Sequence, residues 1–156
     1  MAAYTDSHGF NKGTVAAHPA TGLNKVGYLE VTLDFATITA DRATAGVTAL
    51  ATGDSMQVLN LPANTLVLAV GATTTTLEGA ASTFDIGLTG GDVDGFIDGG
   101  NANAAGTTQS TGALLNGDNQ SHYFAAADTI DMLIGVSGAV TDLAKIKVWA
   151  VIVDCS

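Results

Sequence analysis

The sequence predicts an all-β protein: an antiparallel β-sandwich of jelly-roll type with about eight strands and an extended N-terminal arm. Runs of alternating apolar and polar residues recur along the chain at intervals of roughly 8–15 residues, as expected for strands with one buried and one exposed face. No stretch has the periodicity of an amphipathic helix. The 156 residues include 19 glycines, which suit tight turns, and the length fits one domain with a substantial core. A small barrel is the less favoured alternative.

The first expected strand runs from Val26 to Phe35, and every second residue from Leu29 onward is apolar. A second, shorter strand is expected at residues 37–40. Residues 41–53 are small and rich in alanine, and their threonines and glycines argue against a long helix. We therefore expect one short helical turn there or none.

The stretch from Asp54 to Gly99 organises the rest of the chain, because three strand-like runs follow one another in it. The first run, near residues 56–61, is apolar on both faces and is expected to be covered on both sides. Residues 61–64 contain a proline, which fixes φ and cannot donate to a strand ladder, so a turn is predicted there. Strands are then expected at 66–70 and at 83–88, where the alternation is strict.

The second half of the chain contains one long irregular segment and three further strands. Residues 99–121 are predicted to form a long loop that contains a short strand near the apolar residues 113–115. Strands are expected at 122–124, at 130–134 and at 145–154. The last strand is apolar on both faces except for one lysine, so we expect it to be central or covered by another subunit.

Residues 1–25 form the first of two expected parts of the chain, and the sandwich at residues 26–156 forms the second. The first part has no sustained periodicity. One interpretation is a frayed tail. The other is an extended arm that becomes ordered against a neighbouring subunit, with Tyr4, Phe10, Val15 and Leu23 as apolar anchors.

The charge balance argues against nucleic acid as a partner. The chain has 15 Asp and Glu residues against 5 Lys and Arg residues, for a net charge of −10, and the five cations are scattered. Binding to phosphates needs clustered Lys and Arg. Only 13% of residues are charged, so much of the surface consists of small polar and apolar residues that suit contacts with neighbouring subunits.

The single cysteine, Cys155, cannot form an internal disulfide. The N-terminal residues lack the pattern of a signal peptide, and no apolar run is long enough to span a bilayer. We therefore expect no membrane partner, and a protein that stays in a cytoplasm or leaves it by a route other than secretion.

The segment 91–99 contains the strongest candidate for a metal site. Asp92, Asp94 and Asp98 lie within seven residues of one another, and carboxylates are the ligands that Ca²⁺ prefers. The spacing departs from the EF-hand loop, because Gly95 is the fourth residue from Asp92 and no glutamate closes the site. The favoured interpretation is therefore a connection between strands, with no cofactor, and a bound Ca²⁺ ion is the alternative.

Catalytic motifs are absent from the sequence. There is no G-x-S-x-G elbow, no phosphate-binding loop and no histidine pair with the spacing of a zinc site. Cys155 follows Asp154 in an acidic setting that disfavours a thiolate. We expect no enzymatic activity.

Several segments resemble small jelly-roll structural proteins of marine tailed bacteriophages, of the kind that decorate or cement the capsid. These are VTLDFATI near residue 31, DSMQVLNLPANTLVLAV, STFDIGLTGGDVDGFIDG and the closing KVWAVIVD, with the LPANT turn at 61–65 and the DVDGF loop at 92–96 as the most specific parts. The resemblance covers roughly residues 26–154. It implies a virion protein on the capsid surface, assembled in the host cytoplasm.

The same resemblance implies two partners, the major capsid protein and further copies of this chain in a trimer or dimer. The expected contact residues are Trp149 on the closing strand and the four apolar anchors of the arm. Two other classes remain as alternatives. One is a carbohydrate-binding sandwich of a tail or fibre, and the other, with no motif in its favour, is a small β-sandwich hydrolase.

Overall fold

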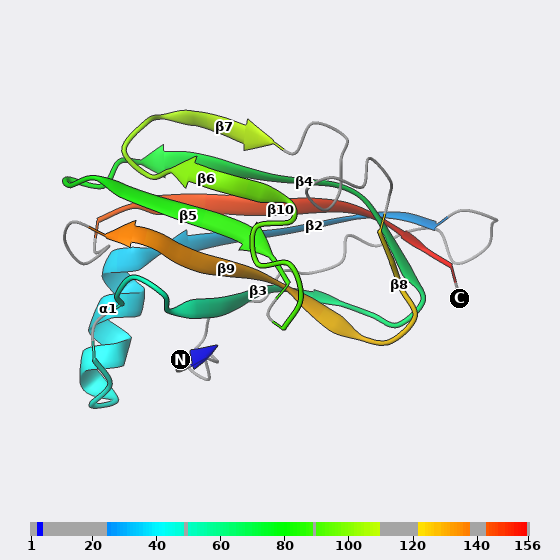
Figure 1. The fold of residues 1–156 in the computed structure, drawn as a ribbon, viewed down its shortest axis with the longest axis horizontal. Helices are drawn as coiled ribbons and strands as arrows, with labels where there is room; N and C mark the ends of the chain where they lie inside the picture. The colour runs from blue at the N-terminus through cyan, green and yellow to red at the C-terminus, as the bar shows by residue number, and fades with distance from the viewer. Residues whose placement is uncertain are drawn as a thin grey trace.

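The computed structural model describes residues 3–4, 25–48, 50–88, 90–109, 122–137 and 143–155, which form two β-sheets and one helix (Figure 1). In chain order the elements are β1 (Ala3–Tyr4), β2 (Lys25–Asp34), α1 (Phe35–Thr44), β3 (Ser55–Leu61), β4 (Thr65–Thr76), β5 (Ser82–Gly87), β6 (Ile97–Asn101), β7 (Gly106–Gln109), β8 (His122–Phe124), β9 (Asp128–Ser137) and β10 (Lys145–Asp154).

One sheet has the strand order β1-β3-β9-β5-β6, and the other has the order β2-β10-β4-β7, with β8 also paired to β4. The described strand pairs are antiparallel except for the parallel pair β1–β3. Every connection from β2 onward joins the two sheets, apart from β5–β6 and β7–β8. This is the topology of a jelly roll, so the predicted fold class is confirmed.

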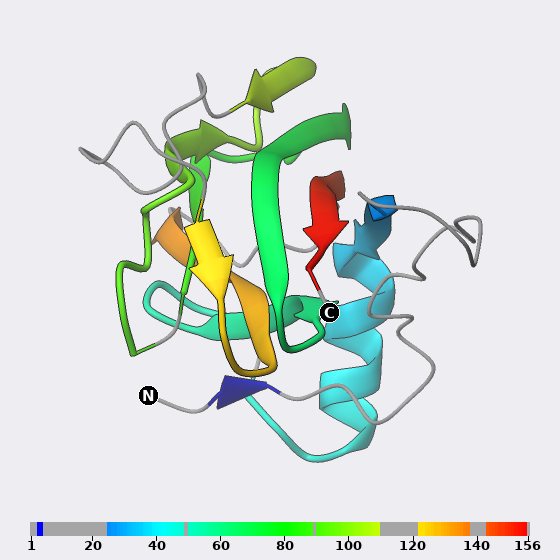
Figure 2. The ribbon, with the colours of Figure 1, turned by 90° about the vertical axis from the view of Figure 1, so that its right-hand side faces the viewer.

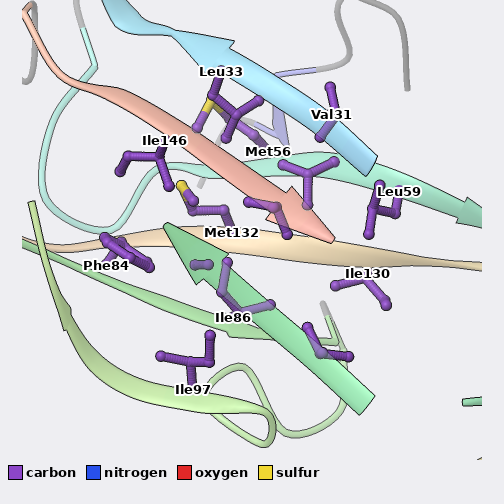
Figure 3. Close-up of a cluster of buried hydrophobic side chains, with 14 of the residues drawn as sticks. Val31, Leu33, Met56, Leu59, Phe84, Ile86, Ile97, Ile130, Met132 and Ile146 are labelled. Atoms are coloured by element: carbon purple, nitrogen blue, oxygen red, sulfur yellow. The ribbon is translucent and has the colours of Figure 1, made fainter. Parts of the chain in front are cut away.

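The core lies between the two sheets and is built from their inward-facing side chains (Figure 3). In β10 the burial alternates strictly, with every second residue from Ile146 buried. Figure 2 shows the two layers from the side, with α1 beside the layer that contains β2. The core residues labelled in Figure 3 are Val31, Leu33, Met56, Leu59, Phe84, Ile86, Ile97, Ile130, Met132 and Ile146.

The helix α1 corrects the prediction for residues 35–44. The sequence pattern predicts the end of one strand and a second short strand there, followed by at most one helical turn, whereas the structure has a ten-residue helix. Asp34 caps it by accepting a hydrogen bond from the Thr37 backbone N–H at 3.4 Å. Phe35, Ile38 and Arg42 share one face of the helix and are buried. Among the described residues, no helix is long and apolar enough to cross a membrane.

The side chains of β3 do not alternate between two faces as the sequence predicted. A β-bulge between Gln57 and Leu59 interrupts its pairing with β9, so that Val58 and Leu59 are both buried. The bulge therefore brings Leu59 and Leu61 to the same side as Met56, and β3 lacks the second apolar face that was predicted for it. The turn that follows is confirmed, and Asn64 adopts a left-handed φ of 59° in it.

Residues 97–109 contain two strands where a loop was predicted from residue 99. The strand β6 pairs with β5, and β7 pairs with residues 71–74 of β4. The strand β8 pairs with the other end of β4, at residues 65–67, so β7 and β8 share one edge of the sheet. The predicted strand near residues 113–115 lies outside the described residues.

Candidate interaction surface

The outward side of the sheet β2–β10–β4–β8 carries a group of apolar side chains toward one end. The strand register aligns Val26, Val153, Leu66 and Tyr123 across the four strands. Val26 is 55% exposed and Tyr123 is 48% exposed, which is high for side chains of this kind. We call the whole group the outer apolar face; it consists of Val26, Tyr28, Leu66, Ala69, Tyr123, Trp149, Val151 and Val153.

Trp149, the contact residue predicted on the closing strand, lies within this face. Its ring stacks on that of Tyr28 of β2, with 6.2 Å between ring centroids and 24° between planes. On the other side, β4 presents Gly71 opposite Trp149. A Cβ atom added to Gly71 would lie 2.8 Å from the indole Nε1 and closer still to two ring carbons. The indole therefore lies directly over the backbone of β4, in space that only glycine leaves open.

The phenol of Tyr28 connects this aromatic pair to a charged neighbour. Burial, a hydrogen bond to the carboxylate of Glu30 and the negative charge of that carboxylate all raise the pKa of Tyr28 above its usual value. The hydroxyl group therefore remains protonated well beyond neutral pH. The pair presents two apolar ring systems with a neutral polar edge, a combination that favours protein interfaces.

The two sheets carry different charges. The five strands β2, β10, β4, β7 and β8 contain three basic and three acidic residues, for a net charge of zero. The strands β3, β9, β5 and β6 contain four aspartates and no basic residue, for a net charge of −4. The whole net charge of −10 therefore lies outside the sheet that carries the outer apolar face.

Two ion pairs on β2 and β10 hold the charged end of that sheet. Lys145 Nζ lies 2.7 Å from Asp34 Oδ2, and Lys147 Nζ lies 3.3 Å from Glu30 Oε2. The hydrogen bond from Lys145 is the largest influence that lowers the pKa of Asp34, and backbone N–H groups at the start of α1 act in the same direction. One end of this surface is therefore apolar, and the other end is charged but locally balanced.

The three aspartates proposed as calcium ligands divide between a turn and a strand. Asp92 and Asp94 lie in the turn between β5 and β6, whereas Asp98 lies in β6. The Asp92 carbonyl accepts hydrogen bonds from the N–H groups of Leu88, at 2.8 Å, and Gly95, at 3.4 Å. Within the described part of the chain, no group of three or more His, Cys, Asp or Glu residues lies close enough to hold a metal ion. The Ca²⁺ site stays a prediction.

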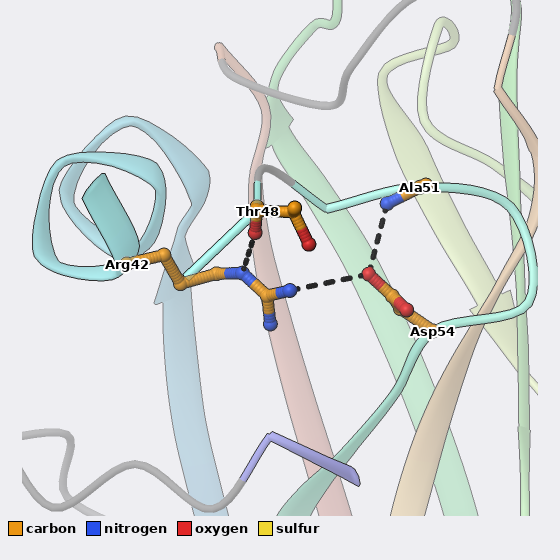
Figure 4. A network of polar contacts seen from close by, with 4 residues as sticks. All are labelled: Arg42, Thr48, Ala51 and Asp54. Carbon is orange, nitrogen blue, oxygen red and sulfur yellow. Dashed lines mark hydrogen bonds and ion pairs between the residues drawn. The ribbon is translucent and has the colours of Figure 1, made fainter. Parts of the chain in front are cut away.

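Two buried charged side chains fix loops at the end of the sandwich that is opposite Val26, Leu66 and Val153. Arg42 is 1% exposed; its Nε donates to the Thr48 carbonyl at 2.7 Å, and its guanidinium nitrogen Nη2 lies 3.3 Å from Asp54 Oδ2 (Figure 4). The same carboxylate oxygen accepts the Ala51 N–H at 3.0 Å. This network ties the segment after α1 to the start of β3.

Glu78 makes a similar connection between β4 and β10. Its carboxylate accepts the N–H groups of Gly79, Leu143 and Ala144 at 3.0–3.3 Å. Both buried groups have partners within their own subunit, so we assign them to the folding of the loops and not to the interaction surface.

Most of the outer apolar face was not predicted as a contact region. The apolar second face of β10 was the available signal in the sequence. Which residues of β2, β4 and β8 lie beside it depends on how the strands pair, and the sequence does not show that.

Of the predicted arm anchors, Tyr4 belongs to β1, whose backbone pairs with Ser55 and Met56 of β3. Phe10, Val15 and Leu23 lie outside the described residues, so the arm stays a prediction.

Comparison with known proteins finds similarity in fold alone. No protein-family model and no curated protein matches the chain. A chain in the capsid of Ralstonia phage GP4 aligns over 99% of both chains, with a TM-score of 0.63 and 13% identity. A chain of the cyanophage Pam1 capsid asymmetric unit aligns over 88% of this chain and 91% of its own length, with a TM-score of 0.53 and 17% identity. A chain from the acid-stable capsid of Helicobacter pylori bacteriophage KHP30 aligns over 90% and 92%, with a TM-score of 0.56 and 10% identity.

Proposed function

We propose that this chain is a structural, non-enzymatic protein of a phage virion that binds the outside of the capsid and stabilises it. The observation that carries the proposal is the alignment of almost the whole chain with whole chains from three phage capsids. These chains are close to this one in length, since each alignment spans about nine-tenths or more of both partners. The similarity is therefore to a complete small subunit, as a decoration or cement protein would be.

The surface of the chain supports a role on the exterior of the shell. A protein of net charge −10 is repelled by the packaged genome, which is itself a polyanion. The outer apolar face offers a contact region that is rich in aromatic residues and balanced in charge, as interface cores are. In this role many copies bind the major capsid protein and further copies of the chain, and the apolar area that they bury opposes expansion of the shell.

The number and location of copies in purified particles tests this role. Quantitative mass spectrometry with cryo-electron microscopy is expected to find many copies on the head surface. Adding the purified protein to shells that lack it is expected to raise the temperature at which they open. A few copies at the tail, or none in the particle, would contradict the proposal.

Deletion of residues 1–25 tests the arm separately. The truncated chain is expected to keep the sandwich, because the core lies in residues 29–152, and to bind shells more weakly through loss of multivalent contact. Circular dichroism verifies the fold, and co-sedimentation with shells measures binding. Equal binding of the truncated and full chains would remove the arm from the mechanism.

A carbohydrate-binding role in a tail or fibre is the second candidate, and the Tyr28–Trp149 pair is the observation that favours it. Partly exposed aromatic rings on a sheet are a suitable platform for a sugar ring. Because Trp149 is the sole tryptophan, quenching of its fluorescence by oligosaccharides would detect such binding directly. A glycan array without hits would count against this role.

A further inference from the structure

We propose that the outer apolar face is the contact between two copies of this chain, which pair face to face about a twofold axis. The inference deepens the proposed function, on which it rests, by naming a second copy as the partner of this surface. It stands on the composition of the face, the distribution of charge over the two sheets and the area available.

The composition of the face matches the core of a protein interface. The aromatic pair Tyr28 and Trp149 lies beside Val151 on the central strand β10, and Val26 and Tyr123 lie toward its rim. Tryptophan and tyrosine are the residue types that most often dominate binding energy when they are enclosed in a contact. The sheet backbone beneath holds them in place, so little conformational entropy is lost on association.

The charge distribution favours a second copy as the occupant. Two molecules with a net charge of −10 repel each other over most of their surfaces, and the sheet with four aspartates has no basic residue to compensate. On the other sheet, β2 and β10 carry equal numbers of acidic and basic residues, and two of the three lysines are already paired with carboxylates. Identical acidic molecules therefore approach each other at least cost through this sheet.

The area of the face fits a modest dimer contact. Strands lie about 4.8 Å apart and residues advance about 3.3 Å, so four strands and roughly five positions cover about 300 Å². This is near the largest apolar patch of an ordinary monomer, and such patches often mark interaction sites. The charged remainder of the sheet, toward Asp34 and Lys145, roughly doubles the area, which approaches the 800 Å² or so per partner of a standard interface. We expect a dissociation constant on the order of micromolar.

Symmetry also favours a pair over a ring. A twofold contact uses the same patch on both copies, whereas a threefold ring needs two different complementary patches on each copy. In the part of the chain that the structure describes, the other exposed large hydrophobics are Val47, Leu77, Val93 and Leu143, which lie outside strands, and Leu68, which lies at the bulge of β4. The outer apolar face alone combines several such residues on one sheet surface.

The test measures self-association of the full-length chain by sedimentation equilibrium and by the fluorescence of Trp149. Dilution is expected to shift its emission to longer wavelength as the face becomes exposed to water. Val151→Lys at the centre of the face and Val26→Lys at its rim are compared with Val93→Lys in the turn between β5 and β6. Each substitution adds one positive charge. We expect the first two to weaken the dimer by about tenfold or more, and the control to change it by less than about twofold.

Two results would overturn the inference. One is a chain that remains monomeric up to about 200 µM. The other is a dimer that Val151→Lys and Val26→Lys both leave intact, because the contact would then lie elsewhere.

Binding to shells, measured in parallel, separates this inference from the proposed function. If the chain is monomeric and binds shells through the outer apolar face, the coat protein is the partner of this face. That result refutes the dimer and leaves the proposed function standing. A dimer that is sensitive to Val151→Lys but absent from virions refutes the capsid role and leaves the contact standing.

Discussion

Replacing Gly71 with alanine is expected to displace Trp149 from the outer apolar face. The backbone at Gly71 is outside the left-handed region, so alanine meets no conformational strain there, and its effect is purely steric. The added methyl group would collide with the indole, which must rotate away and lose its stack on Tyr28. Overpacking of this kind costs about 1–3 kcal/mol, and an aromatic pair contributes about 0.5–1.5 kcal/mol.

These magnitudes predict a measurable loss of thermal stability. In a chain of this size, about 1 kcal/mol changes the melting temperature by about 2–4 °C, so we expect a fall of roughly 3–18 °C by differential scanning calorimetry. The emission of Trp149 should move to longer wavelength, and dimerisation and shell binding should both weaken. Gly91→Ala is the control, because the nearest neighbour of its new methyl group is at an ordinary 3.5 Å.

A double-mutant cycle with Trp149→Ala decides whether the indole is the cause. Once the ring is removed, Gly71→Ala should cost little, so the two substitutions should be strongly non-additive. The reasoning is refuted if Gly71→Ala leaves the spectrum and the melting temperature unchanged. It is also refuted if Gly71→Ala destabilises the chain equally with and without the tryptophan.

Three further substitutions test the polar groups that hold the sandwich together. Arg42→Met should lower the free energy of unfolding by about 3–5 kcal/mol in urea titrations, because it leaves the largely buried Asp54 without its cation; a loss below about 1 kcal/mol would contradict this. Glu78→Gln keeps a single acceptor oxygen for three backbone N–H groups and should cost about 1–3 kcal/mol, with the loop before β10 becoming open to hydrogen exchange. Asp34→Asn should cost up to about 1 kcal/mol at pH 7, since its ion pair with Lys145 is partly exposed. The pKa of Asp34 is lower in the folded state, so its contribution to the free energy of unfolding is present above the unfolded pKa of about 3.9 and is lost as the pH falls through the folded pKa. The stabilities of wild type and Asp34→Asn should therefore converge in acid. A difference in stability that persists there would contradict the assignment.

The prediction of the fold succeeded where burial follows a simple alternation. The strand β10 was predicted with its observed bounds, because its ten residues are rich in β-branched side chains and have a charged residue at each end. The helix α1 was missed because Thr37, Ile38 and Thr39 have the composition of a strand. What favours a helix there is partly local, because Asp34 caps its first turn, and partly dependent on the fold, because the buried Arg42 finds acceptors at Thr48 and Asp54 beyond the end of the helix. The cap could have been read from the sequence, whereas the contacts of Arg42 could not.

The interaction surface was predictable only in part, for the same reason. Trp149 and the apolar second face of β10 were visible in the sequence, but their neighbours depend on strand pairing. A bulge in β4 near Leu68 determines that Leu66 aligns with Val153 and Ala69 with Val151. A shift of one residue would turn the side chains of β4 to the opposite side of the sheet. The face is therefore a property of the register.

The response of self-association to salt can separate the two kinds of contact that this surface could make. If two acidic copies meet through a neutral apolar face, screening reduces the repulsion between their remaining charges, and the dimer becomes tighter as the Debye length falls from about 10 Å at 0.1 M to about 3 Å at 1 M. If instead Lys145 and Lys147 exchanged their internal partners for carboxylates of another molecule, the same screening would weaken the contact. We therefore expect the dissociation constant to fall, by roughly threefold or more, between 0.05 and 0.5 M NaCl. A rise over that range would mean that the charged end of the sheet, and not its apolar end, holds the copies together.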